Sequence, residues 1–191
     1  MLRIVKAAGV AAAVVSLAAC ASQSYRTAWT APDAQPLSIQ SGEKVVGVVV
    51  TADEANREAA EGKLVAELNR RGLEGIAAHT LAAGTEVATL KPAIEESGAA
   101  AVIVMKVVDK ASAGPTKQEP WNSWNWGAAY NAGSPVDGMV FVETRVFDLE
   151  QGKLVWVGQS QMVAPRDVDA AVRDLVEEAG TEMRKQGVIA S

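Results

Sequence analysis

Cysteine and histidine are almost absent from this sequence, and basic residues are outnumbered by acidic ones. The 191 residues include one cysteine, one histidine, 18 Lys or Arg and 23 Asp or Glu, which gives a formal net charge of −5. A single cysteine cannot form an intramolecular disulfide, and one histidine without a cysteine partner cannot build a transition-metal site. An acidic surface also repels the phosphates of nucleic acids. We therefore expect no disulfide, no metal or other cofactor, and no nucleic-acid partner.

Long apolar runs are missing from most of the chain. After residue 20 the longest are Val45–Val50 and Ala99–Met105, which have the length of a strand and are too short to cross a bilayer. The N-terminal start differs, because Arg3 and Lys6 precede an apolar segment at 7–19. A basic start, a short apolar segment and small residues at its end are typical of a secretory signal peptide, which we assign to residues 1–19.

The sole cysteine, Cys20, directly follows this segment and completes the run Leu17-Ala18-Ala19-Cys20. These four residues resemble the bacterial lipobox. The resemblance implies that Cys20 is acylated, that residues 1–19 are removed, and that the acyl chains anchor the protein to a membrane. Ala21, not Asp, follows Cys20, and similarity to lipoprotein sorting then implies the outer membrane, with the domain facing the periplasm. The alternative is an ordinary signal peptide with Cys20 incidental.

The mature chain has the size of one domain. Removal of residues 1–19 takes away two of the 18 basic residues and no acidic one, which leaves 16 basic against 23 acidic residues and a charge of −7. Residues 20–42 contain turn formers and no sustained periodicity, which predicts a flexible tether from Cys20. We expect residues 43–191 to form a single α/β domain.

The first half of that domain alternates strands and helices. Lys44–Val50 has the β-branched composition of a strand buried on both faces, and a helix follows to about Arg71. A weaker strand at Leu73–Leu81, a helix at Glu86–Ser97 and an apolar strand at Ala99–Val108 come next. Such crossovers predict parallel pairing. The apolar stripe expected on the first helix consists of Ala55, Ala59, Leu64, Val65 and Leu68.

The second half predicts a hairpin and a final helix. Apolar and polar residues alternate in Gly138–Leu149 and in Lys153–Ala164, and a short turn separates the two expected strands. One face of the first strand carries Val140, Val142, Thr144 and Val146. One face of the second strand carries Leu154, Trp156 and Met162. A helix from about Arg166 to Gln186 carries apolar residues at offsets of 4, 7, 8, 11 and 15 from Val168. The expected fold is α/β in the order β-α-β-α-β-β-β-α, a single mixed five-stranded sheet flanked by helices.

This element order and four local segments resemble a group of small periplasmic α/β domains. The segments are Lys44–Val50, Leu64–Gly72, Glu96–Val104 and Phe147–Val157. The group includes the N-terminal domain of the Tol-system propeller protein, the periplasmic domain of the curli secretion channel, and the lipoprotein activators of penicillin-binding proteins. The resemblance implies a non-enzymatic binding or assembly role, with an envelope protein or a second copy of the chain as partner. It transfers no catalytic residue.

A long Trp-rich loop at 111–137 is the most unusual stretch of the sequence. It places Trp121, Trp124 and Trp126 within six residues, with Tyr130 shortly after. Trp and Tyr are enriched at interface hot spots, so these four residues are the predicted partner-binding surface for a protein, a glycan or a lipid interface. The alternative is a flap that folds over the sheet and fills a core poor in Phe and Leu.

Catalysis finds no support in the sequence. His79 lies at the end of the weak strand and has no histidine or glutamate partner at helical metal-ligand spacing. Asp53 and Glu54 stand where a helix cap is expected, and no serine has the sequence context of a nucleophile. We expect a non-enzymatic envelope lipoprotein. The alternative is a ligand-binding lipoprotein that holds a small apolar molecule or glycan under the Trp-rich loop.

Overall fold

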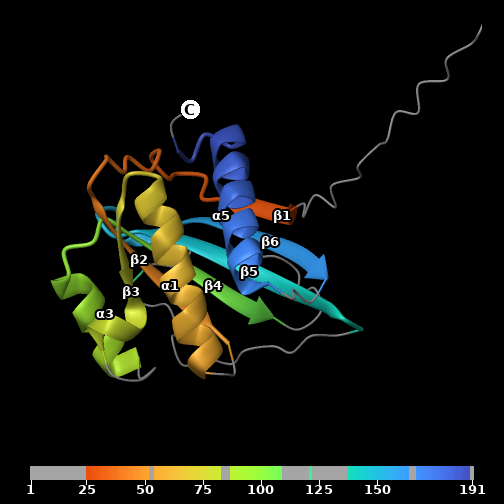
Figure 1. Cartoon of the computed structure of the whole chain (residues 1–191). Helices are drawn as coiled ribbons and strands as arrows, with labels where there is room; N and C mark the ends of the chain where they lie inside the picture. The colour runs from red at the N-terminus through yellow and green to blue at the C-terminus, as the bar shows by residue number, and fades with distance from the viewer. Residues whose placement is uncertain are drawn as a thin grey trace, which may run out of the picture.

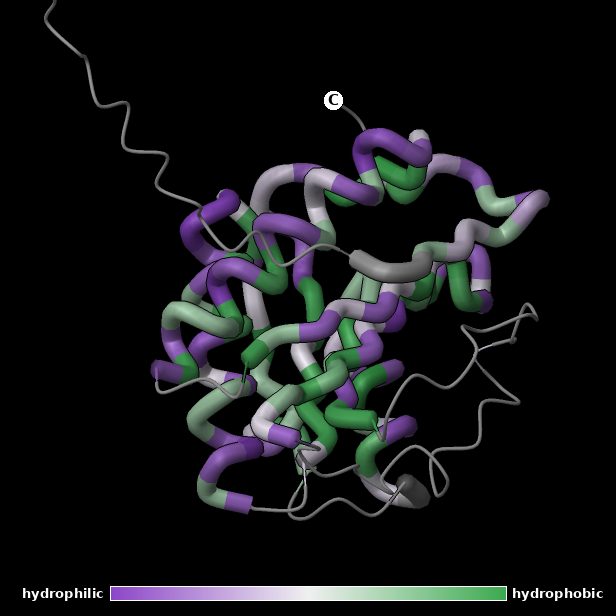
Figure 2. Tube along the Cα trace, turned by 90° about the vertical axis from the view of Figure 1, so that its right-hand side faces the viewer, coloured by the Kyte–Doolittle hydropathy of each residue, from purple (hydrophilic) through white to green (hydrophobic). Residues whose placement is uncertain are grey.

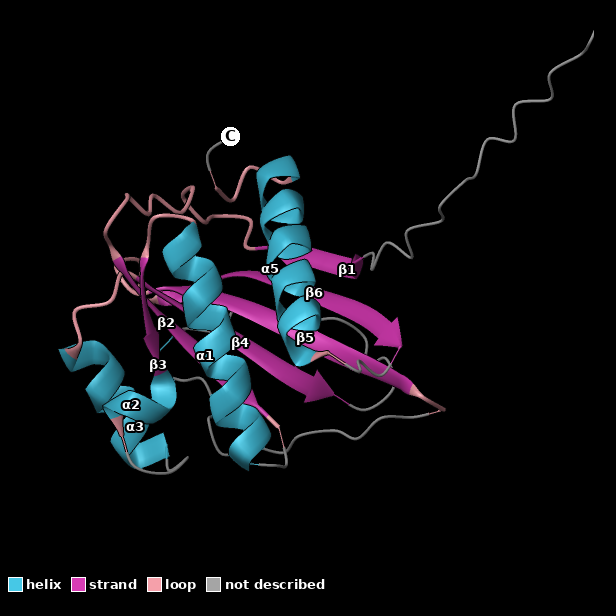
Figure 3. Cartoon of the chain, in the orientation of Figure 1, coloured by secondary structure: helices cyan, strands magenta, loops and turns pink. Residues whose placement is uncertain are grey.

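The computed structural model describes residues 25–51, 54–82, 87–108, 121, 137–163 and 167–189. They form one mixed sheet with helices on both faces (Figure 1, Figure 3). The strands are β1 (Tyr25–Thr30), β2 (Lys44–Val50), β3 (Glu74–Ala77), β4 (Ala101–Val108), β5 (Met139–Asp148) and β6 (Lys153–Val163). The helices are α1 (Glu54–Arg70), α2 (Ala78–Leu81), α3 (Val87–Glu96) and α5 (Val168–Lys185). The predicted mixed α/β fold is confirmed.

The sheet order is β1-β6-β5-β4-β2-β3. Strand β2 pairs in parallel with β3 and β4, whereas β4–β5, β5–β6 and β6–β1 are antiparallel. The parallel pairs come from the half of the chain where strands alternate with helices, because a crossover through a helix returns the next strand in the same direction. The antiparallel pairs come from the hairpin and the strands that flank it.

The described sheet has six strands, so the expected number of five is wrong. The additional strand is β1, which belongs to the range 20–42 that we predicted to be a tether. Its residues favour strands by type, since they include Tyr, Trp and two Thr, but they show no apolar alternation. They pair along β6 from Ser160 to Trp156. The strand thus depends on a partner about 130 residues away in the sequence, and local pattern does not reveal such a partner.

The weak strand predicted at Leu73–Leu81 is shorter than expected. It ends at Ala77, and the next residues form the short helix α2, so His79 lies in a helix and not at a strand end. Only Lys44 to Gly47 of β2 pair with β3. The second half of β2 therefore lacks a strand neighbour on that side, and a side chain takes over part of this role, as described below.

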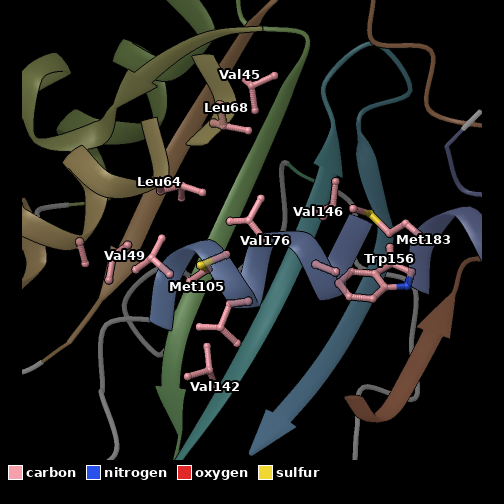
Figure 4. Close-up of a cluster of buried hydrophobic side chains, with 14 of the residues drawn as sticks. Val45, Val49, Leu64, Leu68, Met105, Val142, Val146, Trp156, Val176 and Met183 are labelled. Atoms are coloured by element: carbon pink, nitrogen blue, oxygen red, sulfur yellow. The ribbon is translucent and has the colours of Figure 1, made fainter. Parts of the chain in front are cut away.

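The two faces of the sheet carry separate hydrophobic cores. Helices α1 and α5 lie side by side over one face (Figure 1), where their apolar side chains pack with Val45, Val49 and Trp156 (Figure 4). On the other face, Leu90 and Ile94 of α3 pack against the central strands. Full burial of one Val or Leu side chain stabilises a fold by roughly 1.5–3 kcal/mol. Figure 2 shows the resulting arrangement, with apolar residues gathered inside and hydrophilic residues outside.

The alternation predicted for β5 is confirmed, and that for β6 is confirmed in part. Val140, Val142 and Val146 of β5 belong to the core under α1 and α5, whereas Phe147 belongs to the opposite core. In β6, Trp156 and Met162 share a face, as predicted, and both face helices α1 and α5. The expectation that Leu154 shares their face is wrong. A bulge lies opposite the Val146–Phe147 step, and the extra residue moves Leu154 into the opposite core.

Helix α1 buries Leu64 and Leu68 of the expected apolar stripe but not its first residues. Its buried residues are Arg57, Ala60, Glu61, Leu64, Glu67 and Leu68. Ala55 and Ala59 are exposed, so the predicted stripe is wrong in the first two turns. Charged residues take the buried positions there, which a search for apolar residues overlooks. At Leu64 the helix approaches β2 closely, because a Cβ atom at Gly47 would lie 2.7 Å from Leu64 Cδ2.

Candidate functional site

The residues predicted to carry function lie mostly outside the described part of the chain. This holds for the lipidation site Cys20 and for Trp124, Trp126 and Tyr130 of the predicted partner-binding surface. The roles proposed for these four residues remain predictions. The fourth residue of that surface, Trp121, is described and is only 4% exposed. Its ring is therefore not available to a partner. For this one residue, the structure agrees with the alternative expectation that the loop packs over the sheet.

Trp121 is held by contacts from three directions. Its backbone N–H donates to the carbonyl of Gly152 in the β5–β6 turn at 2.9 Å. Its ring meets Phe147 edge-on, with centroids 5.3 Å apart and planes at 67°. Its indole Nε1–H donates to Glu95 of α3 at 2.8 Å. Trp121 thus fixes the chain to both the hairpin and α3.

Glu95 also accepts a hydrogen bond from Lys91 Nζ at 2.6 Å. The bonds from Lys91 and from Trp121 lower the pKa of Glu95, because both stabilise the ionised carboxylate. The Lys91 ammonium group also lies 5.6 Å from the centroid of the Trp121 ring, within the range of a cation–π contact. Lys91 and Glu95 thus form a charged pair beside the buried apolar ring of Trp121.

A glutamate–histidine pair was not predicted from the sequence. Glu61 of α1 is completely buried, and one of its carboxyl oxygens accepts the backbone N–H of Val49 at 3.0 Å. The other oxygen contacts both the backbone N–H of His79, at 2.9 Å, and its ring Nδ1, at 2.8 Å. Glu61 therefore accepts one backbone N–H in the part of β2 that extends past β3, and it caps the N-terminus of α2, where Ala77 offers no capping side chain.

The Glu61–His79 pair is a clasp that joins α1, β2 and α2. Both carboxyl oxygens are already occupied by groups of the protein. Within the described ranges, no hydroxyl or thiol is hydrogen-bonded to His79 that such a pair could activate. These hydrogen bonds give Glu61 a structural role that explains its burial.

A second feature that sequence reasoning missed is a cleft of about 620 Å³ between α1 and α5. We call it the arginine cleft. Its floor is apolar and is formed by Leu37, Ile39, Leu68, Leu73, Ile103, Val146, Val176, Met183 and Ile189. Figure 4 shows Val146, Val176 and Met183 among the buried side chains of this core. The volume lies within the range of about 300–1,000 Å³ typical of small-molecule sites.

Four arginines line the rim of this cleft. Arg70 and Arg71 come from the C-terminal end of α1, and Arg173 and Arg184 come from α5. Two acids, Glu67 and Glu177, also line it, so the charges of the lining residues sum to +2 in a chain whose total is −5. Arg173 also pairs with Asp174, whose Oδ1 lies 2.9 Å from Arg173 Nη2. Glu67 is buried and pairs with Arg70 and with Arg71, whose Nη2 lies 2.8 Å from the Glu67 carboxylate.

The sequence contains part of the pattern that forms the cleft, but this pattern can be interpreted only when the fold is known. On α5, Arg173, Glu177, Gly180 and Arg184 are spaced by three or four residues, so they follow one side of the helix. In the sequence, Arg70 and Arg71 indicate only a favourable positive charge at the C-terminal end of a helix. Only the packing of α1 beside α5 brings the two sets together. The arrangement combines an apolar floor with cationic hydrogen-bond donors above it.

Two further findings concern the described residues. No helix among them is long and apolar enough to cross a membrane. No group of three or more His, Cys, Asp and Glu side chains in the same ranges lies close enough to hold a metal ion.

Comparison with known proteins yields no family assignment. No family model and no curated protein matches the chain. Similar solved structures include a PelC dodecamer from Paraburkholderia phytofirmans, with 15% identity, a TM-score of 0.43, and coverage of 77% of this chain and 89% of that one. They also include TolB from Acinetobacter baumannii, with 14% identity, a TM-score of 0.42, and coverage of 84% of this chain and 31% of that one. Similarity at this level carries no argument about function.

Proposed function

We propose that this chain is a lipoprotein of the bacterial cell envelope, anchored through Cys20 and acting by binding rather than by catalysis. The run Leu17-Ala18-Ala19-Cys20 after a short apolar segment supports the anchor. The residues after Cys20 support the outer membrane, with the domain in the periplasm. The proposal of a non-enzymatic role is supported by the structural use of Glu61 and His79. An envelope partner at Trp124, Trp126 and Tyr130, or self-assembly, remains part of the proposal.

The observation that carries a binding function is the arginine cleft. An apolar floor beneath a cationic rim suits a small amphiphile with an apolar body and an anionic group. Because arginine presents several N–H donors in a planar fork, it recognises carboxylate and phosphate groups well. The alternative expectation, a ligand held under the Trp-rich loop, concerns residues mostly outside the described ranges and stays a prediction. Among the described residues, a cavity with an apolar floor and a cationic rim lies between α1 and α5.

We expect Cys20→Ala to release the protein from the membrane. The wild-type chain should sediment with membranes and carry the mass of added acyl chains, because two or more buried chains anchor a protein firmly. The variant should be soluble and should lack that mass. Fractionation and intact mass spectrometry measure both. Retention of Cys20→Ala in the membrane fraction, or an unacylated wild-type chain, would contradict the proposed anchor.

Filling the arginine cleft should abolish ligand binding without harming the fold. In Gly180→Leu a side chain enters the cleft, and its Cβ atom meets only Arg184 Nη1, at 3.6 Å. We expect the affinity for dodecyl phosphate, measured by calorimetry below its micelle concentration on the full mature chain with Cys20→Ala, to fall at least about tenfold, or about 1.4 kcal/mol. The cationic analogue dodecyltrimethylammonium should bind neither protein.

Gly62→Leu is the matched control for this experiment. Gly62 lies in α1 outside the cleft, and no atom stands within 4 Å of an added Cβ. Both substitutions replace a helical glycine, so both should raise stability by up to about 1 kcal/mol. Only Gly180→Leu should lose binding. Equal affinity of the two variants for dodecyl phosphate, or binding of the cationic analogue by the parent, would refute the cleft as the site.

A further inference from the structure

The anchored end of the chain leaves the sheet beside the C-terminal end of β6. Strand β1 runs antiparallel to β6, and its first residue, Tyr25, pairs with Ser160. Strand β6 continues past this point to Val163. In Figure 1, β1 and the arrowhead of β6 lie on the same side of the molecule. The N-terminal segment that leads to Cys20 is thus attached at this end of the sheet.

The link between Cys20 and the sheet is short. With β1 in the sheet, only five residue steps separate Cys20 from Tyr25, and a fully extended chain of that length spans at most about 18 Å. A domain of this size has a radius of gyration of roughly 15 Å. An acylated Cys20 therefore holds this end of the sheet near the bilayer at all times. The tether expected at 20–42 would have allowed several times that distance.

The same end of the sheet also carries exposed apolar side chains. Among the described residues, two large hydrophobic side chains are exposed, Val163 at 73% and Val168 at 39%. Val163 ends β6 and Val168 begins α5. Beside them is an apolar pocket of about 270 Å³ that includes Val168 and Met162 in its lining. The rest of this lining is Val49, Thr51, Asn56, Ala60, Met105, Val107, Val140, Val142, Ala171, Val172 and Leu175.

We propose that this end, formed by Val163, Val168 and the apolar pocket, rests on the surface of the bilayer that holds Cys20. The inference depends on the lipid anchor of the proposed function and adds the orientation of the domain. Most of the arginine cleft lies toward the C-terminal ends of α1 and α5, and only Arg173 and Val176 reach into the first half of α5, where the apolar pocket lies. In this orientation the cleft lies farther from the bilayer than the apolar pocket does.

The contact is apolar and not electrostatic. The charged groups at this end are mainly acidic: Asp137 precedes β5, and Asp167 and Asp169 stand at the start of α5, where Lys63 pairs with Asp169 at 2.8 Å. Acidic groups gain nothing from anionic headgroups. The contact should therefore form on zwitterionic lipid and should not weaken at high salt. The acyl chains supply the affinity, and the valines and the pocket set the orientation.

Labels at the two ends of the molecule test this orientation. Because acylation uses the only natural cysteine, Val163→Cys, Val168→Cys and Lys185→Cys each introduce a single free thiol. The lipidated variants are labelled with NBD and placed in vesicles of phosphatidylcholine and phosphatidylethanolamine. We expect labels at 163 and 168 to be quenched several-fold more by nitroxide lipids, and several-fold less by aqueous iodide, than the label at 185.

The outcomes separate the orientation from the anchor. If the protein does not float with the vesicles, the proposed anchor fails. If it floats but labels at 163 and 185 are equally accessible to iodide, the anchor stands and the orientation is wrong. Shielding from iodide at 163 without quenching by nitroxide lipids would mean that a protein surface covers this end, which also overturns the proposal. High salt that abolishes the difference would refute its apolar origin.

Discussion

Glu61→Ala should lower the free energy of unfolding by about 3–5 kcal/mol, within the range expected when two buried N–H groups each lose their acceptor at a cost of about 1–3 kcal/mol. The substitution leaves the backbone N–H groups of Val49 and His79 without an acceptor, and neither finds water easily at a position where Glu61 itself is fully buried. At about 2–4 °C for each kcal/mol in a domain of this size, the melting temperature should fall by about 6–20 °C. Thermal and urea unfolding of the mature chain measure both quantities.

Three comparison variants make this prediction specific. Glu58→Ala changes an exposed glutamate one turn earlier in α1 and should stay within about 0.5 kcal/mol of wild type. Glu61→Gln should cost about 1–3 kcal/mol, because its NH₂ group faces an N–H donor whichever way the amide turns. His79→Ala removes the ring contact but keeps the backbone N–H, so it should cost about 1 kcal/mol. A Glu61→Ala protein as stable as Glu58→Ala would refute the clasp.

Amide exchange gives a local reading of the same effect. The N–H groups of Val49 and His79 should exchange faster in Glu61→Ala than expected from the overall loss of stability, because their acceptor is gone. Val48, in the same strand, serves as the internal reference. Uniform acceleration across β2 would mean that Glu61 acts through general packing rather than through these bonds.

The Glu61–His79 pair also shows which kind of feature cannot be predicted from the sequence. The strand Lys44–Val50 was predicted with the bounds that the structure has, because a β-branched run buried on both faces needs no knowledge of its neighbours. Glu61 could not be found in the same way. Its role depends on the short length of β3 and on the start of α2, which are properties of the assembled sheet. A glutamate in a helix is far more often on the solvent side.

The strand β1 and the arginine cleft escaped prediction for a related reason. Neither can be recognised from one segment alone: β1 is defined by its pairing with β6, and the cleft is formed by two helices about 100 residues apart in the sequence. Leu154 shows the reverse case, in which a correct local pattern gives the wrong face, since a bulge shifts the alternation by one residue. Sequence periodicity therefore predicted most of the helices and strands but not the surfaces between them.

Trp121→Ala should lower the free energy of unfolding by about 3–5 kcal/mol, the usual cost of truncating a buried tryptophan. The substitution removes the edge-on contact with Phe147, the hydrogen bond to Glu95, and the apolar surface that Trp121 adds to the core under α3. Trp124→Ala is the matched comparison, because we predict that position 124 contacts a partner and not the core. It should stay within about 0.5 kcal/mol of wild type. Equal losses for the two variants would assign both rings to the core.

Trp121→Phe separates the hydrogen bond from the apolar contact. It keeps an aromatic ring near Phe147 but loses the indole N–H, so it should cost about 1.5–3 kcal/mol, the range for a bond to a charged group. The bond helps to hold the pKa of Glu95 below its usual value. A carboxyl group with a lowered pKa in the folded state contributes stability above its unfolded pKa, and this stability is lost as the pH falls through the folded pKa.

The difference in stability between wild type and Trp121→Phe should therefore be full at neutral pH. It should shrink only when the pH falls below the ordinary range of a glutamate, through the lowered pKa of Glu95. Unfolding by urea at several pH values measures this difference. Glu95→Gln in the same background is the control, because it removes the ionisable group and should make the effect of Trp121→Phe independent of pH. A difference that stays constant with pH in the presence of Glu95 would show that Trp121 acts through its ring alone, and the indole–carboxylate bond would then contribute nothing to stability.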